Sequence, residues 1–364
     1  MKKHSNRDGL AVIIMAGGMG TRFWPASRES VPKQFLPICG SRRMVEECFL
    51  RIASLTGPGK IFVIINIRHR SFTRKILGGR GIQIVEEPYG RNTAPCIGLG
   101  CLHIMQSLGD LPIIALPADH FISDEDVFRR CLRRAIPLLE DGGIVTIGIT
   151  PTHPEIGYGY IEKGQALGNG EAYRVKRFVE KPDVETAIGF LASQSYLWNA
   201  GIFLFRPSTI LREIGIHLPR INRGLNRISE AIGTDHYLST LEEVYRDMES
   251  ISIDYGVMEK TAGPIYVIQG NFGWSDVGNW AAVRKLREAE RDGHGNIVSG
   301  KAMLLDAKNT LIHSQSNRLI AVLGLDNLLV VDTEDVLLVA DIKQSQEVRR
   351  FPERLRQKGW TECI

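Results

Sequence analysis

Residues 10–36 read LAVIIMAGGMGTRFWPASRESVPKQFL, an apolar run that passes into glycines and then into spaced cations. Leu10 to Met15 contains no polar residue, which is typical of a strand covered on both faces in a parallel sheet. Gly17, Gly18 and Gly20 then allow a tight turn in which bare backbone N–H groups approach a ligand. The stretch therefore predicts a buried strand that runs into a phosphate-binding loop.

Three cations, Arg22, Arg28 and Lys33, follow these glycines. Arg grips two phosphate oxygens at once and Lys acts as a point charge, so the segment suits a polyphosphate. An ordinary turn followed by a solvated charged segment is the alternative, and the glycines by themselves leave it open. The spacing matches neither GxGxxG nor GxxxxGK[ST], which disfavours a nicotinamide-dependent dehydrogenase and a P-loop NTPase.

Composition restricts the class of protein. A chain of 364 residues predicts one large domain and a smaller one. The net charge is +4 without a dense basic block, which argues neither for nucleic acid nor for a membrane surface as a partner, and we expect neither. No stretch approaches the roughly 20 apolar residues of a membrane span. The six cysteines are scattered without a CxxC pair, which favours reduced thiols in the cytoplasm over disulfides or zinc.

The N-terminus resembles a secretory signal, because Lys2, Lys3 and Arg7 precede a short apolar run. That run is near the minimum length for a signal core and ends in AGGMGTR rather than in a plain small-residue cleavage site. We therefore interpret residues 1–9 as a tail and the apolar run as a strand.

Strand and helix patterns alternate along residues 10–290. After the first strand, we expect strands at residues 61–65, 82–85, 113–116, 144–149, 202–205 and 265–268, and helices at 44–55, 93–107, 124–139 and 184–193. This alternation predicts a mostly parallel, doubly wound sheet, whose ligands bind beyond the carboxyl ends of the strands. The glycine loop lies at such an end.

The pattern changes in residues 291–364. Short apolar runs near residues 297, 303, 311, 319, 328 and 336 are separated by DAKN, SQSN, GLDN and DTED. Because Asn and Asp tolerate turn conformations closed to most residues, this spacing predicts a coiled β-solenoid or β-roll. A small antiparallel meander is the alternative. A final amphipathic helix is expected at about residues 344–357.

Two acidic residues follow predicted strands or lie among aromatic residues. Asp119 in LPADH stands just past a buried strand, where a carboxylate suits Mg²⁺ bound to nucleotide phosphates. Asp276 in NFGWSDVGNW is framed by glycines and tryptophans, which indicates a partly dry pocket. The alternatives are a helix cap for Asp119 and a packing corner for Asp276.

Further polar residues suit a sugar or a base. Gly159 in IGYGYI exposes backbone groups, Glu180 and Lys181 stand where a VKRFV strand stops at Pro182, and Asn199 and Gly201 precede IFLF. A solvated turn is the alternative for EKP. Glu86, Glu87, Arg91, Asn92 and Thr93 lie at a strand end and helix start, where backbone donors suit a nucleobase edge or an anion.

These motifs carry a resemblance. AGGMGTRFWPASRESVPKQFL resembles the signature of nucleotide-sugar pyrophosphorylases, and its FWP…SR…PKQFL form is similar to the mannose-1-phosphate guanylyltransferases. EPYGRNTAP, LPADH, GYGYI, FVEKP, WNAGIFLF, SIDYGVMEK and FGWSDVGNW extend the resemblance over nearly the whole chain in order. It implies an α/β fold, with a Rossmann-like nucleotidyltransferase domain of mostly parallel mixed sheet at residues 10–290 and a small left-handed β-helix-like domain at 291–364.

The resemblance also implies the reaction GTP plus mannose 1-phosphate giving GDP-mannose and pyrophosphate, with Mg²⁺ as cofactor. It implies that Arg22 and Lys33 are catalytic and that Asp119 and Asp276 bind the metal. It places the nucleotide at Ala16, Gly17, Gly18, Gly20, Asn92, Thr93, Ala94 and Asp119. It places the sugar phosphate at Gly159, Glu180, Lys181, Asn199 and Gly201.

Longer members of the family carry an isomerase domain, for which we expect no room here, so only guanylyl transfer is inferred. The β-helix-like tail implies a homo-oligomer, a dimer, formed through the C-terminal domain. A pyrophosphorylase for another base or sugar and a non-catalytic nucleotide-sugar sensor remain as alternatives. A pure sensor has little need of Arg22, Lys33, Asp119 and Asp276 together.

Overall fold

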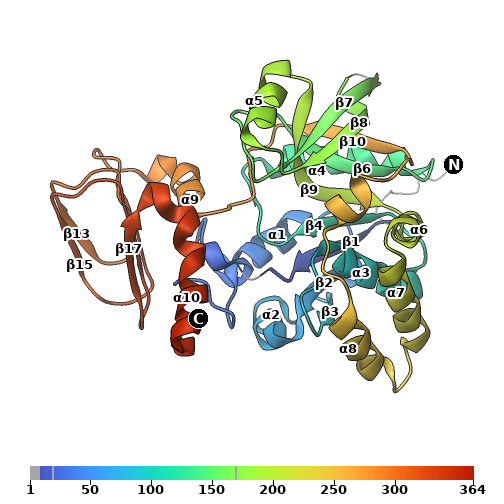
Figure 1. The fold of residues 1–364 in the computed structure, drawn as a ribbon, viewed down its shortest axis with the longest axis horizontal. Coiled ribbons are helices and arrows are strands. Elements are labelled where there is room, and N and C mark those ends of the chain that lie inside the picture. Colours follow the sequence, from blue (N-terminus) through green and yellow to red (C-terminus); the bar gives the residue numbers. More distant parts are fainter. Residues whose placement is uncertain (1–8, 19, 169) are drawn as a thin grey trace. The chain divides into compact units, whose positions relative to one another are not determined.

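The computed structural model describes residues 9–18, 20–168 and 170–364 (Figure 1). It contains two compact units. The sheet unit comprises residues up to Gly17, Cys48–Ala118 and Ile122–Trp274, and the β-helix unit comprises Gly18–Glu47, Asp119–Phe121 and Ser275–Ile364. Residues 1–8 of the predicted tail lie outside the described residues, and the predicted boundary between residues 290 and 291 stays a prediction.

The sheet unit is built on a nine-stranded sheet in the order β3-β2-β1-β4-β9-β6-β10-β8-β7. The strands are β1 Ala11–Ala16, β2 Ile61–Asn66, β3 Gln83–Glu87, β4 Ile113–Pro117, β6 Ile144–Ile149, β7 Gly159–Leu167, β8 Ala172–Glu180, β9 Tyr196–Phe205 and β10 Ile265–Gly270. β3, β2, β1 and β4 are parallel, as are β6 and β10, whereas β9 is antiparallel to β4 and β6. The expected mixed sheet is confirmed.

The helices are α1 Met44–Ile52, α2 Arg70–Leu77, α3 Thr93–Leu108, α4 Glu125–Ala135, α5 Val184–Ser193, α6 Pro207–His217, α7 Pro219–Ala231, α8 Tyr237–Asp247, α9 Trp280–Leu286 and α10 Arg350–Lys358. There are also short 3-10 helices, at η1 Thr21–Phe23, η2 Lys33–Phe35, η3 Pro58–Lys60, η4 Ile67–His69, η5 Ile136–Leu139, η7 Glu288–Glu290, η8 Ile342–Arg349 and η9 Thr361–Cys363. A short π-helix, η6, comprises Asp254–Met258. Among the described residues, no helix is long and apolar enough to cross a membrane.

Local sequence explains where several helices begin. Asn92, Asp124 and Asp183 accept hydrogen bonds from backbone N–H groups at the starts of α3, α4 and α5. No element was expected at residues 207–247, although Pro207 and Pro219 occupy the first positions of α6 and α7, where Pro is favoured.

The strand expected at residues 202–205 is longer than predicted, because β9 begins at Tyr196. Asn199 and Gly201 therefore lie within the strand rather than before it, which corrects the sequence interpretation. A buried Asn is tolerated there because Thr146 of β6 donates a hydrogen bond to its side-chain oxygen at 3.0 Å.

The β-helix unit contains short stacked strands, drawn from orange to red in Figure 1. They are β12 Ile297–Ser299, β13 Ala302–Leu305, β14 Leu311–Ser314, β15 Ile320–Leu323, β16 Leu328–Asp332 and β17 Leu337–Asp341. β12, β14 and β16 pair in parallel, and so do β13 and β15, as expected for successive coils and not for a meander. Only the final pair, β16 and β17, is antiparallel among these described strands. The left-handed sense of the coils stays a prediction.

The corners and the final helix of this unit also follow the sequence. Asp306, Asn309 and Asn327 have positive φ angles of 52°, 54° and 57°, so the corner residues adopt the expected conformation. The helix expected at residues 344–357 is present as η8 and α10.

The segment that follows the glycines packs into the same unit. Phe23, Trp24 and Leu36 share one buried apolar cluster with Trp280 of α9 and Ile297 of β12. The remaining short strands are β5 Phe121–Ile122 and β11 Trp274–Ser275.

Candidate functional site

The glycine loop begins where β1 ends at Ala16. Gly20 has a φ of +64°, and a Cβ atom on it would overlap the Cβ of Lys33. Glycine is therefore required at position 20 both for the left-handed backbone and for the close approach of Lys33. Gly18 has more open surroundings, since nothing lies within 4 Å of a Cβ atom built on it.

Lys33 is a buried cation in the β-helix unit, with a side chain only 6% exposed. Its Nζ donates to Asp119 Oδ2 at 2.9 Å and to the backbone oxygen of Asp276 at 2.8 Å. The ammonium also lies 5.4 Å from the centre of the Phe23 ring. Residues 33, 119 and 276, which are far apart in the sequence, are thus brought together at one ammonium group.

Asp119 keeps a side chain that is 32% exposed. Burial by itself would raise the pKa of this carboxyl, but the charges of Lys33 and His120 and the hydrogen bonds outweigh it, and the pKa is lowered. Asp119 is not the cap of the following helix, because Asp124 accepts the cap hydrogen bond of α4. Its carboxylate is therefore ionised and not committed to capping.

Backbone strain adjoins Asp276. The next residue, Val277, is fully buried and has a φ of 48°, which is unfavourable for a β-branched residue. Strain of this kind persists only where the surroundings impose it, and it is concentrated at functional sites. Arg22, by contrast, is exposed on η1, and the described contacts of Lys33 do not include it.

The predicted sugar residues converge in the sheet unit. Glu180 is 8% exposed and accepts a hydrogen bond from Lys181 Nζ at 2.6 Å. A Cβ atom on Gly159 would overlap Glu180 Oε2 and lie 3.3 Å from Asn199 Cβ. The Gly201 N–H donates to Asn199 Oδ1 at 3.1 Å. All five residues therefore belong to one cluster, in which Lys181 has a positive φ of 47°.

Asp254 belongs to the same cluster and was not singled out from the sequence. Asn199 Nδ2 donates to Asp254 Oδ1 at 2.8 Å. Burial and the nearby charge of Glu180 raise the pKa of Asp254 to about 7. The residue begins the π-helix η6, a rare element that is frequent at functional sites. The acid within SIDYGVMEK was the available signal, but only the fold brings it to Glu180 and Asn199.

The start of α3 holds the residues predicted for the base. Asn92 caps the helix with a φ of 67°, Thr93 Oγ1 accepts from Ile253 N at 2.8 Å, and Ala94 is fully buried. The capping and the contact with residue 253 fix this helix start in place. These groups lie in the sheet unit, where β3 is followed by the start of α3. A strand end followed by a helix start was predicted for these residues.

Glu87, at the end of β3, is only 3% exposed. Tyr245 Oη donates to Glu87 Oε1 at 3.1 Å, and a Cβ atom on Gly17 would lie 3.4 Å from Oε2. Burial raises the pKa of Glu87 to about 8, and hydrogen bonds from Tyr245 and Cys96 only partly offset it. A carboxyl group that titrates near neutrality thus lies beside the first glycine of the loop.

A family model described as Nucleotidyl transferase matches residues 11–293. The chain belongs to the nucleotidyl transferase family. A second model, described as MannoseP isomerase/GMP-like beta-helix domain, matches residues 300–355 of this nucleotidyl transferase.

Relatives of this nucleotidyl transferase cover nearly its whole length. The xanthan biosynthesis protein XanB of Xanthomonas campestris pv. campestris is 42% identical over 355 residues, which are 96% of this chain and 74% of that protein. A mannose-1-phosphate guanylyltransferase of Escherichia coli is 38% identical over 97% of this chain and 75% of its own length. A solved structure from Thermus thermophilus, described as a mannose-1-phosphate geranyltransferase, is 35% identical with a TM-score of 0.85 and covers 96% of this chain and 99% of that chain.

The ionised carboxylate of Asp119 in this nucleotidyl transferase suits a hard divalent cation. Mg²⁺ prefers oxygen ligands and takes one or two protein carboxylates, completing its shell with water and substrate phosphates. Asp119 is ionised, and Lys33 links it to the backbone of Asp276. Among the described residues there is no group of three or more His, Cys, Asp or Glu side chains placed to hold a metal.

We predict that Glu87→Gln stabilises the ligand-free nucleotidyl transferase at alkaline pH. The native pKa of about 8 lies above the ordinary value of 4.5, so the native state binds more protons than the unfolded state between these values. Wild-type stability therefore falls as pH rises through this window, and the neutral Gln avoids the loss. The free energy of unfolding is measured with urea at pH 5 and at pH 8.5. Between these two values the variant should become more stable relative to wild type by roughly 2–5 kcal/mol.

Glu86→Gln is the control, because Glu86 lies next to Glu87 on β3 but forms an ion pair with Arg70 of α2. Its difference from wild type should stay nearly constant between the two pH values. Parallel pH profiles for Glu87→Gln and wild type would contradict a raised pKa at Glu87.

Proposed function

We propose that this protein transfers GMP from GTP to α-D-mannose 1-phosphate, giving GDP-mannose and pyrophosphate. The observation that carries the proposal is the buried Lys33 ammonium, which binds Asp119 and the backbone of Asp276 next to the glycine turn at Gly20. A cation fixed by burial beside an ionised carboxylate suits a polyphosphate with a bound metal ion. The relatives named mannose-1-phosphate guanylyltransferase support this choice of base and sugar.

The transfer needs no protein nucleophile. An oxygen of the sugar phosphate, already an anion, attacks the α-phosphorus of GTP in line, and the bond from that phosphorus to the pyrophosphate oxygen breaks. The enzyme must align two anions that repel one another and neutralise the charge of the leaving group. We assign this neutralisation to Lys33, with Arg22 and the N–H groups of Gly17, Gly18 and Gly20 on the nucleotide phosphates.

We propose Mg²⁺ as the cofactor, held by Asp119 and Asp276. When bound, it supplies positive charge to the phosphates of the nucleotide. Lys33 donates to Asp119 Oδ2 at 2.9 Å, so its ammonium lies beside the carboxylate that would hold the cation. The salt bridge therefore keeps the Lys33 ammonium close to the place where we expect the nucleotide phosphates to bind.

The sugar phosphate is assigned to the cluster of Gly159, Glu180, Lys181, Asn199 and Gly201. Glu180 and Asn199 provide acceptors and a donor for hydroxyl groups, while Lys181 suits the phosphate. Glu180 lies so close to Gly159 that a side chain at position 159 would overlap its carboxylate. This close packing supports a narrow binding site for the sugar ring. We add Asp254 to this cluster, since Asn199 orients its carboxyl group.

The guanine base is assigned to Ala16, Asn92, Thr93 and Ala94, together with Glu87. The Watson–Crick edge of guanine presents two adjacent N–H donors, which match a carboxylate. Tyr245 already donates to Glu87 Oε1, and the other carboxyl oxygen faces Gly17. Binding of the two guanine donors would favour the ionised form of Glu87.

The decisive experiment measures pyrophosphate release for GTP, ATP, UTP and dTTP, each with mannose 1-phosphate and with glucose 1-phosphate. We expect GTP with mannose 1-phosphate to be fastest. A preference for another pair would support a pyrophosphorylase of different specificity. Binding of GDP-mannose without pyrophosphate release from any pair would support the sensor.

We predict that Glu180→Gln raises the KM for mannose 1-phosphate about tenfold or more, with a smaller effect on the KM for GTP. The reason is that a hydroxyl donor loses a charged acceptor. Glu162→Gln is a matched control, because Glu162 also accepts from a lysine, Lys176, at 2.6 Å in the same sheet. Equal losses for both substrates would argue against a sugar contact at Glu180.

We further propose a cytoplasmic homodimer formed through the C-terminal domain. Met303 and Leu305 on β13 and Leu323 on β15 are exposed apolar side chains on paired strands, which supports an interface there. The six cysteines are scattered without a CxxC pair, which supports a reducing compartment. Light scattering tests the dimer, and a monomer at micromolar concentration would contradict it.

A further inference from the structure

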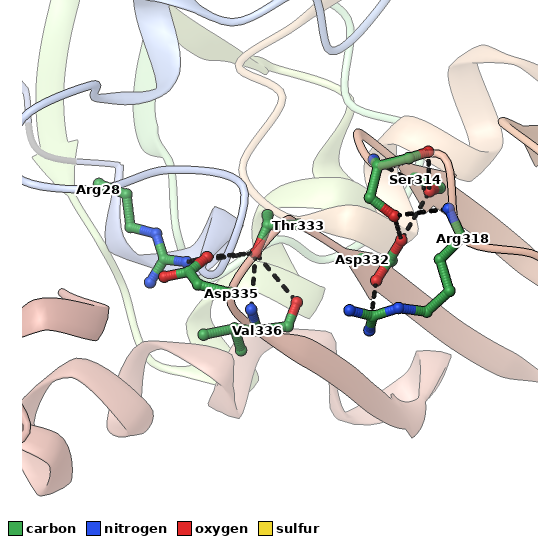
Figure 2. Close-up of polar contacts among 8 residues, drawn as sticks. Arg28, Ser314, Arg318, Asp332, Thr333, Asp335 and Val336 are labelled. Carbon is green, nitrogen blue, oxygen red and sulfur yellow. Dashed lines mark hydrogen bonds and ion pairs between the residues drawn. The ribbon is translucent and has the colours of Figure 1, made fainter.

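Arg28 follows the glycine loop, yet its side chain is directed to the β-helix coils. It is 13% exposed and forms an ion pair with Asp335 at 2.8 Å. It also donates to Thr333 Oγ1 at 3.3 Å (Figure 2). A further hydrogen bond goes to the backbone oxygen of Cys363. Its donors are therefore occupied within the β-helix unit, which corrects the expectation from sequence that Arg28 joins Arg22 and Lys33 on a polyphosphate.

The partner of Arg28 is a hydrogen-bonded turn between β16 and β17. Thr333 N donates to Val336 O at 2.9 Å, and Val336 N donates back to Thr333 Oγ1 at 3.1 Å. The Thr333 hydroxyl lies 2.9 Å from Asp335 Oδ1, which orients the carboxylate toward Arg28 (Figure 2). A preorganised acceptor of this kind makes the contact with Arg28 specific in direction.

The C-terminal segment holds the same loop from a second side. Trp24 donates through Nε1 to the Cys363 oxygen at 2.7 Å and stacks on Phe351 of α10, with ring centres 5.1 Å apart. Glu29 forms an ion pair with Arg356 of α10. Residues 24–29 are thus bound both by the β16–β17 turn and by the C-terminal helix.

This bound segment is connected to Lys33 through a few short hydrogen bonds. Arg28 and Val31 exchange two backbone hydrogen bonds at 3.0 and 3.1 Å, and Lys33 begins η2 directly after Pro32. Ser27 Oγ donates to the Gly20 oxygen at 2.6 Å, and Gly20 packs against Lys33. Arg28 is therefore linked to Lys33 by a hydrogen-bonded segment of five residues.

We propose that Arg28 is a positioning residue, through which the β16–β17 turn and the C-terminal helix hold Lys33 in its contact with Asp119. The C-terminal coils then contribute to phosphoryl-group chemistry without touching substrate. This inference rests on the proposed role of Lys33. A misplacement of about 1 Å in a charged group costs up to about a hundredfold in rate, so a modest loosening of the loop is measurable.

A second Arg–Asp pair in the same coils provides a control. Arg318 donates to Asp332 Oδ1 at 3.1 Å, and Ser314 and Ser316 donate to the other carboxyl oxygen (Figure 2). This pair links β14, β16 and the loop after β14, and makes none of the contacts that hold residues 24–29. Removing Arg318 therefore tests a general loss of stability in the coils.

The experiment compares Arg28→Ala, Arg28→Lys and Arg318→Ala with wild type. It measures kcat and both KM values for GTP and mannose 1-phosphate, the thermal midpoint, and the rate at which an amine-acylating reagent labels Lys33, read by mass spectrometry. We expect Arg28→Ala to lower kcat about 10- to 100-fold with KM values within about threefold, and to speed Lys33 labelling. Arg28→Lys should restore part of kcat and slow the labelling of Lys33 toward the wild-type rate. Arg318→Ala should change neither kcat nor the rate of Lys33 labelling.

The outcomes separate this inference from the proposed function. Unchanged Lys33 labelling in Arg28→Ala overturns the inference whether or not wild type transfers GMP. An increase in the KM for GTP at constant kcat also overturns it, because that would place Arg28 on the nucleotide. If wild type releases no pyrophosphate, the proposed function fails, and faster Lys33 labelling in Arg28→Ala alone still supports the positioning of Lys33.

Discussion

Replacement of Lys33 by Ala is expected to lower kcat for pyrophosphate release by roughly 10²–10³-fold while the protein stays folded. Lys33 is the one cation that the described contacts bring to Asp119 and Asp276 together, and burial fixes its position. A charge held in place before the reaction stabilises the leaving group without reorganisation. Single-turnover measurement of pyrophosphate release, with circular dichroism to confirm folding, checks this prediction.

Lys163→Ala is the matched control for Lys33→Ala. Lys163 also places its ammonium 5.4 Å from an aromatic ring, that of Tyr173, but it lies on β7. The substitution removes a cation over an aromatic ring without touching Asp119, so kcat should stay near the wild-type value. Turnover of Lys33→Ala within about threefold of wild type would remove Lys33 from the reacting centre.

Replacement of Asp119 by Asn is expected to raise the Mg²⁺ concentration for half-maximal activity about 10- to 100-fold and to lower the maximal rate. The lowered pKa of Asp119 keeps its carboxylate ionised, and the isosteric amide removes the charge while retaining an oxygen that accepts from Lys33. A Mg²⁺ titration of activity, run beside isothermal titration of Mg²⁺ with GTP present, provides the measurement.

Asp124→Asn serves as the control for Asp119→Asn. Asp124 lies five residues further along and caps α4 with its side chain, a role that Asn also fulfils. Its Mg²⁺ titration should coincide with that of wild type. The metal assignment would be lost if Asp119→Asn and wild type gave the same titration curve.

Local sequence was sufficient for the elements with strong patterns. The apolar run after Leu10 is a fully buried strand, and Asp306, Asn309 and Asn327 are at corners of the parallel coils. Such features depend on neighbouring residues alone, through periodicity and through the turn conformations that Asn and Asp tolerate. They were therefore predictable without knowledge of the packing.

The extent of β9 and the role of Asp254 were not predictable in this way. In the sequence, the polar Asn199 indicates the boundary of a strand. It can lie inside the buried sheet because Thr146 donates a hydrogen bond to its side chain, and this contact is visible only in the fold. Asp254 is an ordinary acid in the sequence, and its pKa of about 7 depends on burial and on Glu180, which lies 74 positions earlier. Hydrogen-bond partners and burial come from segments that only the fold brings together.

The sequence by itself determined the class of this protein: an α/β sheet with a glycine loop, followed by stacked short coils, and a set of motifs in family order. The tertiary structure decided which of its charged residues act together. Lys33 binds the carboxylate of Asp119 and the backbone oxygen of Asp276, whereas Arg28, only five residues away, pairs with Asp335. The physical reason is that periodicity is local, while the energy of a charge depends on partners and burial supplied by remote parts of the chain.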